Sequence, residues 1–350
     1  MTELIETLAQ HRFDEAALAR YLAVNLEEAR EPFGVRQFQG GQSNPTFLVT
    51  DAEGHRYVVR KKPPGVLLAS AHAVDREFAV MKALYPLGVP VPNARAYCGD
   101  VSVIGTEFYV MDYVEGTVHT DLTLAEAPRE VRRDYYFAMA DGLAALHKVD
   151  WRAAGLENFG RPEAYVARQI SRWTKQYLAS DPEPNPDMEA LMEWLPAHLP
   201  NDEAAVIAHG DFRLGNLIFA ANEPVLLATL DWELATIGHP LSDLAYLCSF
   251  YRLSSVGDTF KGIKGLDLAA LGIPDEAAMV DRYCAAAGRA HPGKDWPFYL
   301  AFSLFRSASI GQGVYDRARR GNAADKRGHL YLGMARGCSK IGWEIAQNGV

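Results

Sequence analysis

His209-Gly-Asp-Phe-Arg-Leu-Gly-Asn216 is the stretch of sequence that decides the fold, together with Asp231-Trp-Glu233 a little further along the chain. Asp211 and Asn216 lie five residues apart, and Asp231 follows 15 residues after Asn216, at the end of an apolar run. A single Asp or Asn in such a place most often stabilises a turn. The ordered set of three instead predicts that these residues share one site.

The order and spacing of these three residues are typical of enzymes that transfer a phosphoryl group. The γ-phosphate is surrounded by negative charge, so hard oxygen ligands must hold Mg²⁺ across the phosphates while a carboxylate orients the attacking hydroxyl. We therefore expect Asp211 to act as the base, and Asn216 and Asp231 to bind Mg²⁺. His209 lies two residues before Asp211, where we expect it to support the loop from behind and not to catalyse.

The hydrophobic period changes near the middle of the chain, which predicts an α+β protein with two lobes. The first part favours strands at residues 46–50, 57–60 and 108–111, with a turn at 51–54. One helix is expected there, from Ser70 as its N-cap to Gly88 beyond its end, and this helix carries Glu77.

After Gly116 the helical period dominates, at residues 126–148, at 161–179 and after Pro240, around short apolar runs at 204–208, 217–219 and 225–230. The Pro-rich residues 181–186 indicate an exposed loop. We therefore expect three parts: an N-terminal helical extension (1–32), a β-rich N-lobe that binds nucleotide (33–114), and a larger, mainly α C-lobe for catalysis and substrate binding (115–350).

The N-lobe offers candidate contacts for ATP. Exposed backbone N–H groups between the first strands would cover the phosphates, at Gly40, Gly41, Ser43 and Asn44. Arg60, at the end of Tyr57-Val-Val-Arg60, would be the cation on the phosphates and Glu77 its helical partner. Strand alternation places Lys61 on the opposite face from Arg60, and Lys61 remains a rival for this role. The adenine would contact a set of strand and hinge residues, namely Val58, Met111, Asp112 and Val114.

Composition narrows the class of partner. The net charge is −9, and the sequence has no dense basic cluster other than Arg60-Lys61-Lys62. Nucleic acid is therefore not expected as a partner. No apolar run approaches the ~18 residues of a membrane helix, and the four cysteines are far apart, so we expect a cytoplasmic protein with reduced thiols that acts on a small molecule. The sequence leaves open whether the chain is a monomer or a homodimer.

Taken together, these motifs resemble the aminoglycoside phosphotransferase-like branch of the kinase superfamily, over residues 33 to 345. The likeness rests on Gly40-Gly-Gln-Ser-Asn-Pro45, Tyr57-Val-Val-Arg-Lys-Lys-Pro-Pro-Gly65, Ala73-Val-Asp-Arg-Glu77, Tyr109-Val-Met-Asp-Tyr-Val-Glu-Gly116, His209 to Asn216 and Asp231-Trp-Glu233. It is most similar to the kinase-like domains found beside or fused to acyl-CoA dehydrogenases. The resemblance implies a bilobal protein-kinase-like fold, the use of ATP and Mg²⁺, and a structural role for Asp243 in anchoring the catalytic loop.

The acceptor is less constrained by the sequence. Arg213 lies two residues after the expected base, where a cation fits poorly with a polycationic aminoglycoside. We therefore expect a hydroxyl compound that carries a carboxylate, phosphate or CoA group, with Arg213 or Arg306 as the anion contact. Arg213 bracing Asp211 is an equal alternative. The resemblance points to hydroxyacyl chains; an aminoglycoside, macrolide or choline kinase and a regulatory, nucleotide-binding pseudokinase are the competing functions.

Overall fold

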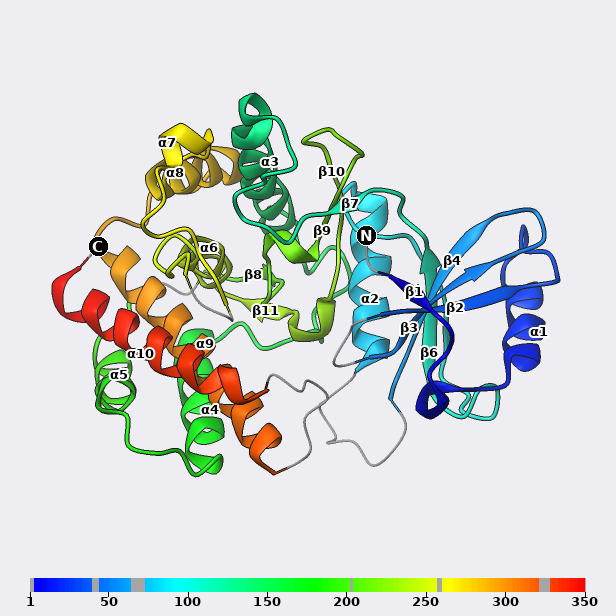
Figure 1. Cartoon of the computed structure of the whole chain (residues 1–350), viewed down its shortest axis with the longest axis horizontal. Coiled ribbons are helices and arrows are strands. Elements are labelled where there is room, and N and C mark those ends of the chain that lie inside the picture. The colour runs from blue at the N-terminus through cyan, green and yellow to red at the C-terminus, as the bar shows by residue number, and fades with distance from the viewer. Residues whose placement is uncertain are drawn as a thin grey trace.

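The chain folds into two lobes, an N-lobe built on a β-sheet and a larger helical C-lobe (Figure 1). A computed structural model describes residues 3–39, 44–63, 73–201, 204–256, 260–320 and 328–349. The predicted α+β, kinase-like, bilobal architecture is confirmed.

The N-lobe sheet has six strands, paired antiparallel throughout. In spatial order they are β1 (Leu4–Ile5), β2 (Gly34–Phe38), β3 (Thr46–Thr50), β4 (Arg56–Lys61), β6 (Phe108–Asp112) and β5 (Ala94–Cys98). The predicted turn between β3 and β4 forms because the Asp51 carboxylate accepts hydrogen bonds from the backbone N–H groups of Glu53 and His55. In the resulting register Arg60 lies opposite Thr46 on one side and Tyr109 on the other.

Residues before β2 form part of the same lobe. Helix α1 (Glu15–Asn25) begins at Asp14, whose side chain accepts the N–H of Ala17. Its buried Leu18 and Leu22 pack in one cluster with Phe47 of the sheet. Strand β1 pairs with β2, so this segment contributes a helix and an edge strand to the N-lobe.

Helix α2 (Val74–Leu84) lies on the other side of the sheet, between the two lobes (Figure 1). It ends in the short helix η2 (Tyr85–Leu87), where Gly88 takes the left-handed conformation expected of it, with φ 75°. The expected N-cap, Ser70, lies outside the described residues. Met81 packs with Trp232 and Ile237 of the C-lobe in one core, which fixes α2 against the C-lobe.

The helices of the C-lobe pack around one large hydrophobic core, in which most residues of α9 are buried. These helices are α3 (Arg129–His147), α4 (Tyr165–Ala179), α5 (Pro186–Ala197), α6 (Pro240–Ser249), α7 (Leu268–Leu271), α8 (Glu276–Ala287), α9 (Trp296–Arg319) and α10 (Tyr331–Asn348). Helix α5 was not expected from the sequence. The Pro-rich stretch is a helix start as well as a loop, because Asn185 caps the N–H of Met188 and Pro186 is the first helical residue.

Two small sheets support the motif residues. One contains β7 (Thr117–Val118), β9 (Leu217–Phe219) and β10 (Leu226–Thr229), and the other contains β8 (Val206–Ala208) and β11 (Thr236–Gly238). At the hinge between the lobes, a Cβ on Gly116 would lie 2.3 Å from the carbonyl oxygen of Phe219, so only glycine allows the linker to pass β9 so closely. The four cysteines are unpaired and buried. Within the described ranges, no helix has the length and apolar character needed to span a bilayer.

Candidate active site

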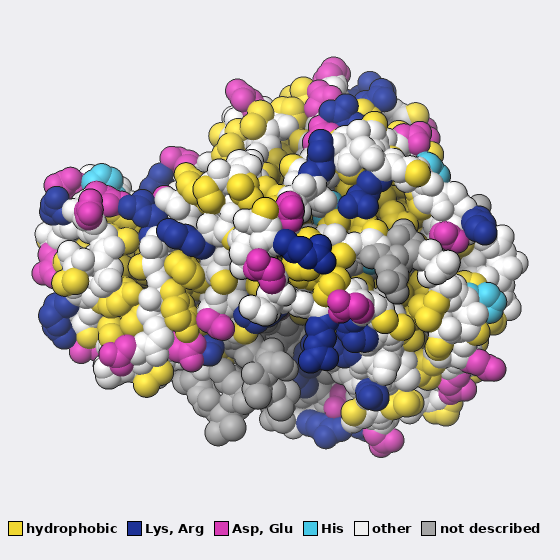
Figure 2. All heavy atoms as spheres, turned by 180° about the vertical axis from the view of Figure 1, so that it is seen from behind, with side chains coloured by type: hydrophobic (Ala, Val, Ile, Leu, Met, Phe, Trp, Pro, Cys, Tyr) yellow, Lys and Arg dark blue, Asp and Glu magenta, His cyan; other side chains and the backbone are white. Residues whose placement is uncertain are grey.

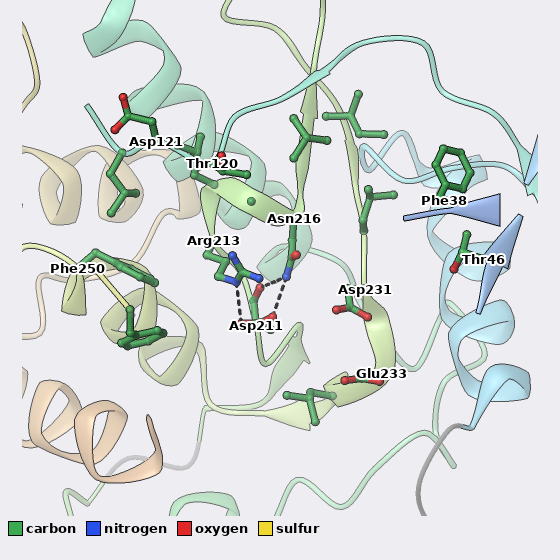
Figure 3. A pocket seen from close by; sticks show the side chains of 18 of the residues that line it. Phe38, Thr46, Thr120, Asp121, Asp211, Arg213, Asn216, Asp231, Glu233 and Phe250 are labelled. Atoms are coloured by element: carbon green, nitrogen blue, oxygen red, sulfur yellow. Dashed lines mark hydrogen bonds and ion pairs between the residues drawn. The ribbon is translucent and has the colours of Figure 1, made fainter. Parts of the chain in front are cut away.

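A cavity of about 1550 Å³ lies between the lobes and collects most of the expected site residues. Figure 2 shows the hollow between the lobes, with basic side chains beside hydrophobic ones, and Figure 3 shows the residues inside. Its lining includes, from the N-lobe, Val58, Arg60, Met111, Asp112 and Val114, and from the C-lobe, Asp211, Arg213, Asn216, Asp231, Glu233, Tyr246, Phe250, Phe260, Lys261, Ile310 and Met334.

Asp211 lies in the loop of residues 209–216, which the sequence predicts to be the catalytic loop. Its side chain is 23% exposed and lines the cavity. Asn216 holds it with one amide nitrogen, which donates to the Asp211 carboxylate at 2.8 Å and to its backbone carbonyl at 2.9 Å. Arg213 forms an ion pair with the same carboxylate at 3.4 Å (Figure 3). Both partners come from the short turn that ends in η3 (Leu214–Asn216), so the spacing seen in the sequence closes a loop around Asp211.

Asp243, at the start of α6, holds the same loop from behind. Its buried carboxylate accepts the backbone N–H of His209 at 2.6 Å and that of Gly210 at 2.9 Å. His147 lies 3.3 Å from this carboxylate and contacts the Tyr283 hydroxyl with its other ring nitrogen at 2.7 Å. Burial opposes ionisation of Asp243, but the contacts with His147, His209 and Gly210 lower its pKa below the ordinary value. The structure thus places Asp243 where the resemblance implied an anchor.

His209 bridges two parts of the platform with its ring. Nε2 donates to the carbonyl of Leu230 at 2.9 Å, and Nδ1 accepts the backbone N–H of Asp211 at 3.1 Å, which assigns the neutral tautomer. Burial lowers the pKa of His209, in agreement with a neutral ring. The ring is fully buried and does not line the cavity, so its contacts are those of a support for the loop.

Arg60 joins the two lobes at the cavity. Its guanidinium pairs with Glu77 of α2 at 3.0 Å and with Asp231 of the C-lobe at 2.8 Å. Glu77 is 1% exposed and accepts further hydrogen bonds from Asn44 at 2.8 Å and Tyr109 at 3.0 Å. Burial raises the pKa of Glu77, and the charge of Arg60 opposes that rise. The expected pairing of Arg60 with the helical carboxylate is therefore present in the structure.

The residues expected from the sequence to bind Mg²⁺ are Asn216 and Asp231. Because Asn216 directs its amide nitrogen to Asp211, its carbonyl oxygen is left to accept another group. Asp231 holds the left-handed conformation, with φ 66°, a strained state for a residue with a side chain and one that is concentrated at functional sites. Among the described residues no cluster of three or more His, Cys, Asp or Glu is arranged to hold a metal ion. Two protein oxygens fit an ion that is bound mainly through phosphate.

The expected nucleotide contacts divide into three groups. Val58, Met111, Asp112 and Val114 line the cavity where the hinge leaves the sheet. Asn44 is fully buried beside Glu77, where it positions the carboxylate and does not line the cavity. Gly40, Gly41 and Ser43 lie outside the described residues.

The rival cation, Lys61, points away from the cavity. It is buried on the face of β4 opposite Arg60, with its ammonium nitrogen 5.8 Å from the centre of the Phe13 ring. Burial lowers the pKa of Lys61. Arg60 is therefore the cation of this pair that lines the cavity.

The structure corrects the interpretation of Arg306 as a substrate contact. Arg306 is buried in α9, does not line the cavity, and donates to the carbonyl oxygen of Gly210. Its guanidinium also lies over the rings of Trp173 and Tyr246. Arg306 thus braces the catalytic loop. Arg213, in contrast, both pairs with Asp211 and lines the cavity, so both roles expected for it are compatible with its position.

Sequence reasoning missed part of the C-lobe wall. Tyr246 of α6 and Phe250, the C-cap of that helix, line the cavity together with Asp211, and Phe260, Ile310 and Met334 add further apolar lining. These residues come from α6, α9, α10 and the loop before α7, and only packing brings them together. The one available signal was the helical spacing of Tyr246 and Phe250 after Asp243.

Comparisons with known proteins agree with this geometry. A protein of Ralstonia eutropha, provisionally assigned as an aminoglycoside phosphotransferase, is 44% identical and superposes with a TM-score of 0.87 over 96% of this chain and 99% of its own. A choline kinase from Cryptosporidium parvum superposes with a TM-score of 0.66 over 96% of this chain and 97% of its own, at 14% identity, a likeness of fold alone.

Curated relatives are longer proteins. The human acyl-CoA dehydrogenase family member 11 is 40% identical over 99% of this chain and 45% of its own length. The probable acyl-CoA dehydrogenase IBR3 of Arabidopsis thaliana is 44% identical over 90% of this chain and 40% of its own. The chain thus spans less than half the length of these relatives. The model of the phosphotransferase enzyme family matches residues 34–299, which include parts of both lobes and the motifs from Gly40 to Glu233, and the chain belongs to that family.

Proposed function

We propose that the chain is an ATP-dependent kinase that transfers the γ-phosphoryl group to a hydroxyl of a small molecule. The observation that carries this proposal is the contact of Arg60 from the N-lobe with Asp231 from the C-lobe, 2.8 Å apart, in the cavity that Asp211 and Asn216 also line. Phosphoryl transfer depends on positioning and electrostatic stabilisation, and this arrangement supplies a base, metal ligands and a cation around one space.

Asp211 is the group that would receive the acceptor hydroxyl. Its carboxylate faces the cavity and is held by Asn216 and Arg213, so its orientation is set before the substrate arrives. Arg60 would contact the phosphates, with Glu77 fixing the guanidinium from the buried side. Asn216 and Asp231 would hold Mg²⁺, which when bound neutralises charge on the phosphate oxygens.

The C-lobe end of the cavity favours an acceptor with an anionic group and an apolar chain. Phe250, Phe260 and Met334 form an apolar wall, while Arg213 and Lys261 supply positive charge. Hydroxyacyl groups carried on CoA have both properties, and relatives of this chain bear the names of acyl-CoA dehydrogenases. We therefore propose a hydroxyacyl-type acceptor in preference to an aminoglycoside, macrolide or choline, whose positive charge Arg213 and Lys261 would repel.

The first experiment removes the charge of Asp211 and keeps its shape. Asp211→Asn should lower ATP turnover by about 10²- to 10⁴-fold, the usual contribution of a general base. The matched control is Asp141→Asn, because Asp141 is a partly exposed residue of α3 that pairs with Arg282 and does not line the cavity. ADP release and the gain of one phosphoryl group on the acceptor, seen by mass spectrometry, are the measurements. Equal turnover in the two variants contradicts the proposal.

The acceptor is tested with a panel of hydroxyacyl-CoA esters of increasing chain length, an aminoglycoside, a macrolide and choline. Phosphorylation of the hydroxyacyl esters alone, with kcat/KM rising with chain length, is the expected result, because the apolar wall gains contact area with each methylene. Preferential phosphorylation of the aminoglycoside or choline would overturn the acceptor class and leave the kinase assignment standing.

A second candidate, a nucleotide-binding pseudokinase with a regulatory role, is favoured by one observation. The Asp231 carboxylate that a metal ion needs is paired with Arg60 in this structure. Mg²⁺·ATP that binds at micromolar concentration without conversion to ADP, in the presence of every acceptor of the panel, would select this candidate. Turnover that Asp211→Asn abolishes excludes it.

A further inference from the structure

The cations that line the cavity differ in whether a carboxylate already neutralises them. Within the described ranges these cations are Arg60, Arg213 and Lys261. Arg60 and Arg213 each form an ion pair with a carboxylate of the cavity. Lys261, in the loop before α7, is exposed, and no carboxylate in the described part of the chain pairs with it. Its ammonium group is therefore the cavity cation that a bound anion can pair with most readily.

The backbone next to Lys261 is held in place by the turn that follows α6. The N–H of Gly262 donates to the Ser254 carbonyl at 2.9 Å, and the N–H of Ile263 donates to the Phe250 carbonyl at 2.9 Å. A Cβ on Gly262 would lie 2.2 Å from that same Phe250 carbonyl oxygen, so only glycine permits this approach. The chain that carries Lys261 thus has a defined place in the cavity wall.

Phe260, directly before Lys261, has a strained backbone. Its φ of 52° lies in the left-handed region, which an aromatic residue keeps only where surrounding contacts hold it. One such contact is with Phe250, because the two rings pack with centroids 5.2 Å apart. Both rings line the cavity. Phe260 and Lys261 therefore add an apolar group and a cation to one part of the wall.

This part of the wall lies away from the expected nucleotide contacts of the N-lobe. Figure 3 shows Phe250 on the side of Asp211 opposite to Phe38 and Thr46, which belong to N-lobe strands. The cavity volume of about 1550 Å³ also exceeds the ~300–1,000 Å³ of a pocket for one drug-sized ligand. A second molecule therefore has room beside the nucleotide, at the end where Lys261 lies.

We propose that Lys261 is the specificity-determining residue for the acceptor: its ammonium group binds an anionic oxygen group of that molecule, a phosphate of CoA or a carboxylate, while Phe250 and Phe260 contact its apolar chain. This inference rests on the proposed function, in which Asp211 receives the acceptor hydroxyl. Arg213 already pairs with Asp211, so Lys261 is the cation that can bind the acceptor without disturbing the base. An ammonium that donates to phosphate or carboxylate forms a strong, charge-assisted hydrogen bond.

The test compares three acceptors that share one hydroxyhexanoyl group: the CoA thioester, which carries phosphates, the neutral pantetheine thioester, and the free acid, which carries a carboxylate. In Lys261→Gln, the kcat/KM for the anionic acceptor relative to that for the neutral thioester should fall about tenfold. A fall for the CoA thioester identifies phosphate as the bound group, and a fall for the free acid identifies carboxylate. Lys261→Arg keeps the charge and should retain the ratio within about threefold.

Lys264→Gln is the matched control. Lys264 is an exposed lysine of the same loop that does not line the cavity, so this variant loses the same charge elsewhere. Its ratio should stay within about twofold of wild type. An equal fall in both glutamine variants, or an unchanged ratio in Lys261→Gln, would overturn the proposal. So would a Kd for Mg²⁺·ATP that Lys261→Gln weakens about tenfold, because Lys261 would then serve the nucleotide.

Isothermal titration separates this inference from the proposed kinase function, because binding needs no turnover. CoA or hydroxyhexanoate is titrated into the chain in the presence of Mg²⁺·ADP. The Kd for one of these anions should weaken about tenfold in Lys261→Gln and stay within about twofold in Lys264→Gln. Binding of neither anion to the wild type, or equal binding to all three chains, overturns the inference. Binding through Lys261 without any ADP release from ATP defeats the kinase proposal and leaves the anion site standing.

Discussion

The two sides of the catalytic loop differ in how they use a carboxylate. Behind the loop, Asp243 is 1% exposed and accepts two backbone N–H groups, with His147 beside it. At the front, Asp211 is 23% exposed and is held by side chains that leave it open to the cavity. The buried carboxylate fixes the chain, and the open one is available to a substrate.

The contact between the two lobes at the cavity repeats this division. Glu77 is 1% exposed and takes hydrogen bonds from Asn44 and Tyr109, while Asp231 is 33% exposed and faces the cavity. Arg60 connects the two. Burial, and not residue type, thus separates the carboxylates that hold the chain from those that face the cavity.

The largest effect on stability is expected behind the catalytic loop, at the buried Asp243. Asp243→Asn replaces one acceptor oxygen by a donor, so one buried N–H of His209 or Gly210 loses its partner, at a cost of about 3 kcal/mol of unfolding free energy. Urea denaturation measures this loss. Asp141→Asn on the surface should stay within ~0.5 kcal/mol of wild type. If Asp211→Asn destabilised the fold as much as Asp243→Asn, the division between the two sides would be wrong.

A smaller effect on the stability of the fold is expected from pH, through the buried histidines His147 and His209 behind the catalytic loop. Burial lowers the pKa of His147 and His209 below 6.5, so both are neutral in the folded chain. The unfolded chain takes up protons first as the pH falls through about 6.5, and stability that is fully present above that pH is lost below it. The urea midpoint should therefore be level between pH ~8 and ~7 and fall towards pH ~5.5.

The variant His147→Gln sharpens this prediction. Glutamine keeps a donor towards Asp243 but has no titrating group, so the fall of the midpoint below pH ~6.5 should become shallower. A wild-type midpoint that stays constant down to pH ~5.5 would show that these rings do not carry the dependence.

Local sequence signals were sufficient to predict the fold and many of the residues that line the cavity. The strands β3, β4 and β6 follow from alternating apolar residues, and the opposite faces of Arg60 and Lys61 follow from the two-residue period of a strand. The loop around Asp211 was predictable because Asn216 and Arg213 lie within five residues of it. The functional roles of these residues stay predictions.

Contacts between distant elements were not predictable in the same way. Arg306 is 96 residues from Gly210 in sequence, and nothing local distinguishes a brace from a substrate contact. That Tyr246 lines the same cavity as Asp211 depends on how α6 packs beside the loop. Helix α5 was missed because proline residues favour loops and first helical turns equally, and only the capping contact of Asn185 decides between them.

The smallest effect is expected at Lys61, the neighbour of Arg60 on β4. Lys61 lies on the buried face of the sheet and does not line the cavity, so Lys61→Met should leave the Kd for Mg²⁺·ATP within about twofold of wild type. Burial already lowers the pKa of Lys61, and a methionine of similar length suits the apolar neighbours there, so the unfolding free energy should not fall.

Arg60→Met is the matched variant, with the same kind of change one residue away. Loss of its guanidinium leaves Glu77 buried without a counter-charge and removes the cation from the cavity, so ATP binding should weaken by about 10-fold or more. Isothermal titration with Mg²⁺·ATP compares the two variants directly. If Lys61→Met weakened binding and Arg60→Met did not, the cation would reach the phosphates from the opposite face of β4, and the assignment of the cavity as the nucleotide site would have to be reversed.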